Sequence, residues 1–136
     1  MPPSSYQPAA PPVSVLRIIR GALAAAPVLL GCVGLWKWHG HAVDPAEHAM
    51  HAPIGIVAYA LCVAAVGAVL AFRGIRARQE PAVRATYSLI GWAFAEAAAM
   101  LGGVYLLLDG TPWPWVLGLM VVAFSWMQIP ADPAEV

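Results

Sequence analysis

Glu96 is the residue whose position most directly implies membrane chemistry, because it lies about halfway along an apolar run, residues 85–108, that contains no basic residue. A charged carboxylate at mid-bilayer depth opposes insertion by roughly 2.5–3.5 kcal/mol, so such groups are usually paired or functional. We therefore expect a neutral carboxyl that faces another helix and is hydrogen-bonded there, with Tyr59, Cys62 or Ser125 as possible partners. This predicts an interhelical hydrogen bond or a proton-binding site, and a cofactor contact is a further alternative.

The second group of reactive side chains is a cluster of all four histidines within a short polar segment. Asp44 followed by a proline and, three residues on, by Glu47 is typical of a helix start, so we expect a short interfacial helix over residues 45–51. Together with Glu47 the histidines resemble a zinc or copper ligand set, and the set comprises His39, His41, His48 and His51. The alternatives are a polar, pH-responsive surface and an axial ligand to a haem or chlorin.

The third group is a set of four arginines between the second and third apolar runs. They are Arg73, Arg76, Arg78 and Arg84. Clusters of this kind next to membrane helices contact anionic lipid headgroups. We expect these four side chains to contact lipid, or alternatively a cytoplasmic subunit.

Four apolar runs must position these groups, at residues 15–36, 53–72, 85–108 and 113–129. A membrane helix needs about 20 apolar residues, and the fourth run is short by that measure. The chain is 61% hydrophobic and only 10% charged, whereas soluble domains carry about 25% charged residues. The sequence therefore predicts an all-α, up-down bundle of four transmembrane helices in one membrane domain, residues 13–136. A Pro-, Ser- and Ala-rich stretch, residues 1–12, precedes it as a disordered or extended tail.

The basic residues predict the orientation. Arg17 and Arg20 lie at the start of the first run and the four loop arginines follow the second, whereas the opposite side carries only Lys37. The positive-inside rule then places both termini and the arginine loop in the cytoplasm of a bacterium, with the protein in its inner membrane. Small residues also line one side of the third run, namely Gly91, Ala95, Ala98 and Gly102, and predict close packing against a neighbouring helix.

One part of the chain resembles a known family. The segment Ala77-Arg78-Gln79-Glu80-Pro81, followed by Ala95-Glu96-Ala97 within an apolar helix, looks like the second half of an ATP synthase c subunit. The resemblance covers about residues 77–108. It implies that Glu96 is an ion-binding carboxylate and that Arg78 and Gln79 belong to the cytoplasmic loop.

Several function classes find no support in the sequence. No nucleophile–base pair, phosphate-binding loop or dinucleotide fingerprint is present, so we expect no enzyme, and the net charge of zero indicates no nucleic-acid partner. Cys32 and Cys62 lie inside apolar runs and are typical of buried thiols, although residues 29–32 resemble a lipoprotein processing site that would leave a lipidated Cys32. The sequence assigns no cofactor and no soluble small-molecule substrate.

The function that these observations favour is a small non-catalytic integral membrane subunit. We expect it to pack against lipid and against other subunits of a larger bioenergetic complex, respiratory or photosynthetic. The first alternative is a proton-translocating protein similar to the c subunit, with Glu96 as the ion carrier. The second is a membrane protein that binds metal through the outer histidine-rich loop.

The orientation can be tested with topology reporters. A reporter fused after Val136, or inserted between Arg78 and Glu80, should give a cytoplasmic signal because the basic residues gather on that side. A reporter inserted near Val43 should give a signal from the outer side. Activity of a periplasmic reporter in the arginine loop would contradict this orientation.

Overall fold

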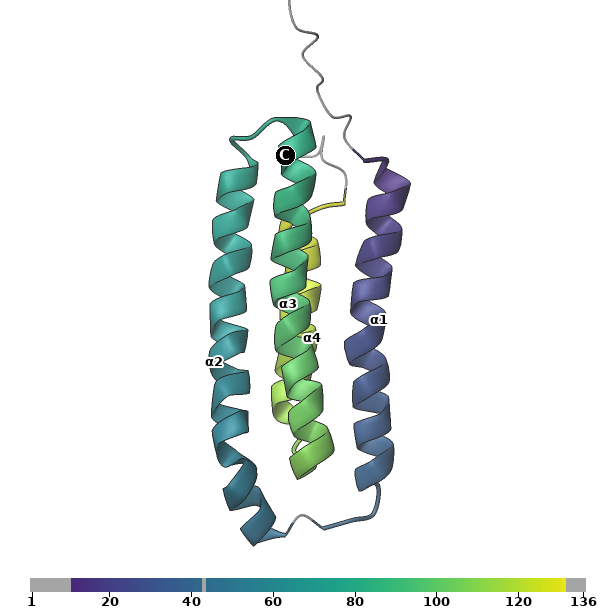
Figure 1. Ribbon diagram of the computed structural model, residues 1–136, viewed down its shortest axis with the longest axis vertical. Coiled ribbons are helices and arrows are strands. Elements are labelled where there is room, and N and C mark those ends of the chain that lie inside the picture. The colour runs from purple at the N-terminus through teal and green to yellow at the C-terminus, as the bar shows by residue number, and fades with distance from the viewer. Residues whose placement is uncertain (1–10, 43, 132–136) are drawn as a thin grey trace, which may run out of the picture.

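The protein is a bundle of four helices that alternate in direction, which confirms the predicted all-α class. The computed structural model describes residues 11–42 and 44–131, so most of the predicted tail, residues 1–12, lies outside the described residues. The helices are α1 (Val13–Trp38), α2 (Pro45–Arg76), α3 (Pro81–Asp109) and α4 (Trp113–Gln128). Both described ends of the chain lie beside the α2–α3 turn at one end of the bundle (Figure 1).

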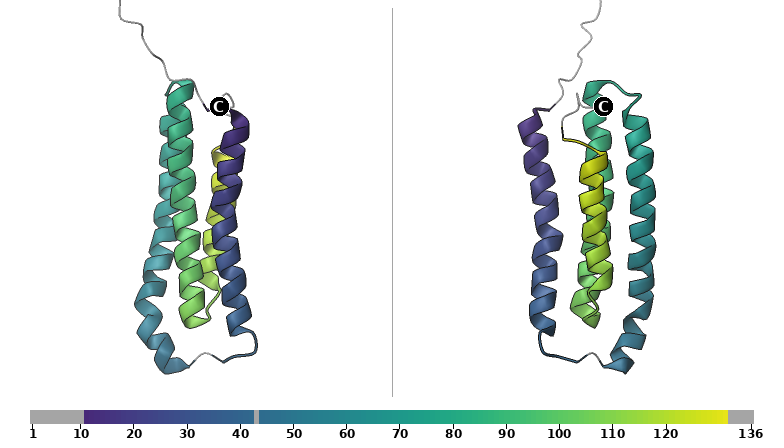
Figure 2. Two further views of the ribbon diagram at one scale, coloured as in Figure 1. Left: turned by 45° about the vertical axis from the view of Figure 1, so that its right-hand side comes forward. Right: turned by 180° about the vertical axis from the view of Figure 1, so that it is seen from behind.

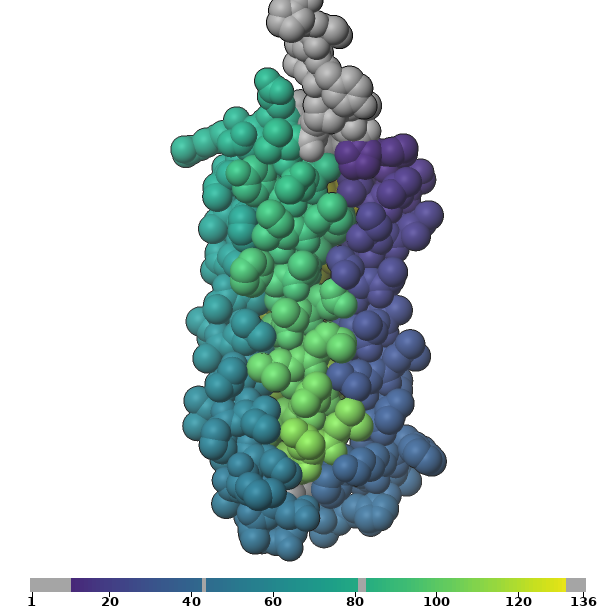
Figure 3. Space-filling view, viewed as in Figure 1, coloured from purple at the N-terminus to yellow at the C-terminus, as the bar shows by residue number. Residues whose placement is uncertain are grey.

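α3 is the central helix of the bundle. α1 and α2 lie on either side of α3 and make no contact with each other within the described residues (Figure 1). α4 covers the opposite side of α3, as the view from behind shows (Figure 2). The remaining side of α3 is left open between α2 and α1, where its side chains reach the surface (Figure 3).

Three of the four helices are long and apolar enough to cross a membrane. They are α1, α2 and the part of α3 from Val83 to Asp109, whereas α4 is apolar but has only 16 residues. Large apolar side chains are exposed along the outer faces of these helices, including Ile18, Leu29, Val63 and Met127. An exposed apolar surface of this extent requires a lipid environment, so the chain is a multi-pass membrane protein.

Small residues bring α3 and α4 into backbone contact, as the sequence predicts. A methyl group added to Gly118 would collide with the backbone of Ala99, and one added to Gly102 would lie 2.5 Å from the carbonyl oxygen of Pro114. Ala98 and Ala99 are fully buried in the same interface. Without an apolar driving force between helices in lipid, such close contact is a main source of their association.

The start of α4 lies deep in the bundle instead of level with the end of α3. Pro114 is next to Gly102, seven residues or about 10 Å before the end of α3. Trp115 therefore points into the bundle. Its ring covers Gly31, and its indole nitrogen donates a hydrogen bond to the carbonyl oxygen of Pro27 at 2.9 Å.

α2 differs from its prediction because the interfacial helix over residues 45–51 and the span over residues 53–72 form one continuous helix. Its start is as expected: the Asp44 side chain accepts a hydrogen bond from the backbone nitrogen of Ala46 at 2.8 Å, and Pro45 follows. Pro53 removes one helical hydrogen bond without ending the helix. The contact of His48 with α3, described below, holds the first turns of α2 in line.

α1 is attached to the C-terminal end of α3 by two donors. The Lys37 ammonium group and the Trp38 indole nitrogen both donate to the carbonyl oxygen of Leu107, at 2.8 and 3.2 Å. Carbonyls in the last turn of a helix lack partners within the helix, so these bonds satisfy one of them. Cys32 and Cys62 are both free thiols; Cys62 is buried as expected, whereas Cys32 is exposed, so its predicted burial is wrong.

The glycines inside and outside the bundle should respond oppositely to the same change. Gly118→Ala should lower the free energy of unfolding by about 1–3 kcal/mol because its methyl group meets the α3 backbone. Gly67→Ala should be neutral or raise it by up to about 1 kcal/mol, since nothing lies within 4 Å and alanine favours helix. Unfolding by SDS titration in mixed micelles measures both, and equal effects would contradict the α3–α4 contact.

Candidate functional site

Glu96 lies on the edge of α3 that faces α1. Two contacts between α1 and α3 bracket it: the Arg20 guanidinium lies 5.7 Å from the ring centroid of Trp92, and Leu30 fills the space beside Gly103. Trp92, Glu96 and Gly103 share one face of α3 by helical spacing. The Glu96 side chain is half-buried there, next to the open side of α3 that is seen in Figure 3.

Within residues 11–42 and 44–131, the structure records no hydrogen bond or ion pair for the Glu96 carboxyl. Its three expected partners are placed elsewhere. The Ser125 hydroxyl donates to the carbonyl oxygen of Val122 at 2.7 Å, and the Cys62 sulfur lies 4.0 Å from the carbonyl oxygen of Pro114. A hydrogen bond between Glu96 and another helix therefore stays a prediction. The partner that we now expect is a helix of another chain.

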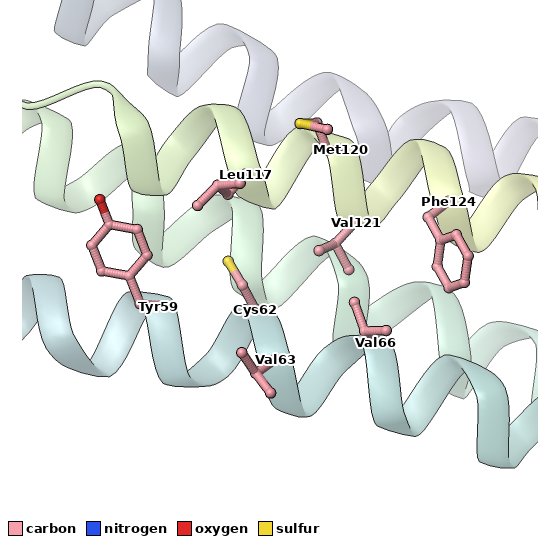
Figure 4. A pocket seen from close by; sticks show the side chains of 8 residues that line it. All are labelled: Tyr59, Cys62, Val63, Val66, Leu117, Met120, Val121 and Phe124. Atoms are coloured by element: carbon pink, nitrogen blue, oxygen red, sulfur yellow. The ribbon is translucent and has the colours of Figure 1, made fainter.

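Tyr59 and Cys62 instead line an apolar groove between α2 and α4, on a different side of α3 from α1. The groove has a volume of about 370 Å³, and Figure 4 shows Tyr59 at one end and Phe124 at the other. Apart from the Tyr59 hydroxyl and the Cys62 thiol, its lining side chains are hydrocarbon or thioether groups. Neither residue can reach Glu96 from this position, because α3 stands between them.

The best-connected polar group of the described chain is Asp109, at the C-terminal end of α3. Its carboxylate is buried, with 0% of the side chain exposed, and its two oxygens lie 2.9 and 3.0 Å from Nδ1 of His48 on α2. The hydroxyl groups of Thr111 and Tyr105 hydrogen-bond to it as well. Because an ionised carboxylate only accepts, Nδ1 of His48 carries the proton in this contact.

The sequence did not predict this cluster of Tyr105, Asp109, Thr111 and His48, of which only His48 was expected to be a site residue. One signal was available. A carboxylate in the last turn of a helix is opposed by the helix dipole, so its presence there indicates specific donors. Gly110 ends α3 in the left-handed conformation, with φ of 76°, and so allows the chain to turn back under Asp109.

The predicted metal site is not formed by the described residues. No group of three or more His, Cys, Asp or Glu side chains comes together there in a way that would hold a metal ion. His48 is held by Asp109, and Nδ1 of His41 lies 3.2 Å from the carbonyl oxygen of His39. The histidines are spread over the end of α1 and the first turns of α2, which directs them apart. His51 and Glu47 also belong to no such group.

The arginines at the other end of the bundle differ in their contacts and in their burial. Arg73 donates to the side-chain oxygen of Gln128, Nε of Arg84 donates to the carbonyl oxygen of Gln79 at 2.6 Å, and Arg76 is buried. Arg78 is exposed. The guanidinium of Arg20 lies 4.3 Å from the ring centroid of Trp126, which joins α1 to α4 by a cation–π contact.

Comparison with protein-family models, curated proteins and solved structures finds no match to this chain. The likeness of residues 77–108 to c subunits therefore rests on the residues quoted above. The function has to be argued from the geometry of the side chains.

The Asp109 cluster should stabilise the end of the bundle where α2 begins and α3 ends. Asp109→Ala removes the acceptor of His48, Thr111 and Tyr105, and should lower the free energy of unfolding by about 1–3 kcal/mol. Asp109→Asn keeps one acceptor oxygen and should lower it less. Glu47→Ala, an exposed acid in the first turn of α2, is the matched control and should cost under about 1 kcal/mol. Equal losses for Asp109→Ala and Glu47→Ala in SDS titration would contradict this role.

Proposed function

We propose that this chain is a non-catalytic integral membrane subunit that docks against another membrane protein along the Glu96 edge of α3. In this proposal the arginine-rich end faces the cytoplasm of a bacterium and the His48–Asp109 end faces outward. The larger assembly is bioenergetic, a setting supported by the resemblance of residues 77–108 to c subunits. The observation that supports this docking surface is the position of Glu96 on α3.

A half-buried carboxyl midway along a membrane helix needs a partner. In water an exposed Glu is satisfied by solvent, but in hydrocarbon each unsatisfied polar group costs several kcal/mol. α1 covers only one side of Glu96, and no described residue bonds to it. A neutral carboxyl that bonds to a group on a neighbouring subunit removes that cost.

The surface around Glu96 is shaped for a neighbouring helix. Ala93 and Ala97, on the open side of α3 next to Glu96, are exposed and carry no bulk beyond a methyl group. Inside the bundle this chain uses similar residues, Gly118 against Ala99, where helix backbones approach closely. We infer that a partner helix with a polar side chain at mid-depth lies over Ala93 and Ala97 and bonds to Glu96.

The same position of Glu96 favours one alternative, a proton carrier. A carboxyl at the border between protein and lipid can gain and lose a proton without an internal partner being broken. The two functions differ in what Glu96→Gln does. The amide keeps hydrogen bonding but cannot titrate, so it preserves docking and abolishes proton transport.

The test is co-purification of the full chain from its native membrane in mild detergent, with a photo-crosslinking amino acid at Ala97 to identify the neighbour. Ala97→Leu should block the helix contact and Glu96→Leu should remove the hydrogen bond, each weakening association by about 3- to 20-fold. Glu96→Gln should keep it.

Ala64→Leu is the matched control, because Ala64 is an exposed small residue on α2, outside the proposed surface. It should leave association unchanged. Crosslinks from Ala97 to lipid alone, with no co-purifying protein, would contradict docking. Loss of proton flux in vesicles with Glu96→Gln, at normal assembly, would favour the carrier.

A further inference from the structure

A hollow on the arginine-rich end of α2 is separate from the Glu96 edge. It has a volume of about 510 Å³ and is lined by Ala71, Gly74, Ile75, Arg78 and Gln79. Gly74 faces open space, with no atom within 4 Å of where a side chain would begin. The floor of the hollow is therefore helix backbone with the apolar side chains of Ala71 and Ile75, and its rim is the polar pair Arg78 and Gln79.

Arg78 is the cation available to this hollow. The neighbouring arginines are occupied: Arg73 donates to Gln128 and Arg84 to Gln79, while Arg76 is buried. The guanidinium of Arg78 is exposed and has no recorded hydrogen bond or ion pair within the described residues, including with Glu80, the carboxylate of the same turn. Its five donors are thus directed to solvent or to a ligand.

The turn that carries Arg78 is held in place by its own backbone. The backbone nitrogens of Arg78 and Gln79 donate to the carbonyl oxygens of Ile75 and Arg76, at 3.0 and 3.1 Å. Nε of Arg84 also donates a hydrogen bond to the backbone carbonyl oxygen of Gln79 at 2.6 Å, which holds this carbonyl in place. The rim of the hollow is thereby positioned before any ligand binds.

We propose that this hollow binds one anionic phospholipid, whose phosphate pairs with Arg78 and the amide of Gln79. A guanidinium matches a phosphate group in geometry as well as in charge. From Arg78 the lining becomes apolar toward Gly74 and Ala71, in the direction of the membrane interior, as the headgroup-to-chain axis of a lipid requires. The upper part of an acyl chain lies over Gly74 and Ala71, where no side chain obstructs it.

A free inorganic anion would use the rim and leave the apolar floor empty. The floor belongs to a helix that crosses the membrane, where lipid is the surrounding solvent. Six of the seven basic side chains of the chain lie toward this end of the bundle and raise the local concentration of anionic lipid. These features favour the phosphate group of a lipid over a free inorganic anion as the ligand of this site.

Native mass spectrometry of the full chain, titrated with phosphatidylglycerol or phosphatidylcholine, tests the site. The chain should bind one phosphatidylglycerol more tightly than phosphatidylcholine. Arg78→Gln should weaken phosphatidylglycerol binding by about five-fold. Gly74→Leu keeps every charge but fills the floor, and should weaken it comparably without disturbing the fold, because Gly74 contacts nothing.

Arg17→Gln is the matched control, since Arg17 is exposed near the same end of the bundle but lies on α1, away from the hollow. It should leave the binding unchanged. Equal weakening by Arg17→Gln and Arg78→Gln would show diffuse attraction instead of a site and overturn the proposal. Displacement of the lipid by inorganic phosphate, or an unaltered affinity in Gly74→Leu, would overturn it too. Thermal unfolding of each variant confirms that the fold is intact.

Discussion

The close contact between α3 and α4 is the constraint on which the other helix positions depend. Gly118 against the backbone of Ala99, and Gly102 against Pro114, allow no side chain between the two helices. This contact draws the start of α4 deep into the bundle, and so places Trp115 where it covers Gly31 and bonds to the carbonyl of Pro27. α1 is thereby attached to the α3–α4 pair at mid-depth, and α2 packs against the same pair from the other side.

The two ends of the bundle are fastened by different chemistry. At the end where α2 begins and α3 ends, a buried carboxylate accepts hydrogen bonds from α2 and from the α3–α4 turn, while Lys37 and Trp38 satisfy a carbonyl at the end of α3. At the arginine-rich end, Arg20 stacks between tryptophans of α3 and α4, and the Trp92 indole nitrogen donates to the carbonyl of Ile129 at 3.1 Å. Both ends therefore add polar contacts to helix pairs that also pack along their length, and the contact of Arg20 with Trp126 joins α1 to α4, which meet little elsewhere.

The sequence was sufficient for features that depend on local composition. Apolar run lengths predicted the four helices to within a few residues at most ends, and the small residues on α3 predicted close packing against a neighbouring helix without identifying it as α4. The sequence could not predict features that depend on how deeply one helix begins or ends in the bundle relative to its neighbours. The inward position of Trp115 follows from where α4 begins, and the burial of Asp109 follows from the reach of His48, 61 residues away in sequence. α2 continues through Pro53 because tertiary support outweighs one lost hydrogen bond.

Glu96 and Asp109 differ in whether their own chain supplies hydrogen-bond donors to the carboxyl group. This difference distinguishes a role in stability from a role in function. Asp109 is surrounded by donors from its own chain, so its role is complete within the fold. Glu96 has no such donors within the described residues, and the residues that hold α1 to α3 on either side of it, Arg20 with Trp92 and Leu30 with Gly103, act without it. Since the bundle does not depend on Glu96, selection for folding alone gives no reason to keep a carboxyl at a depth where it opposes insertion. We propose that a requirement outside the folded monomer, in an assembly or in proton transfer, explains its presence.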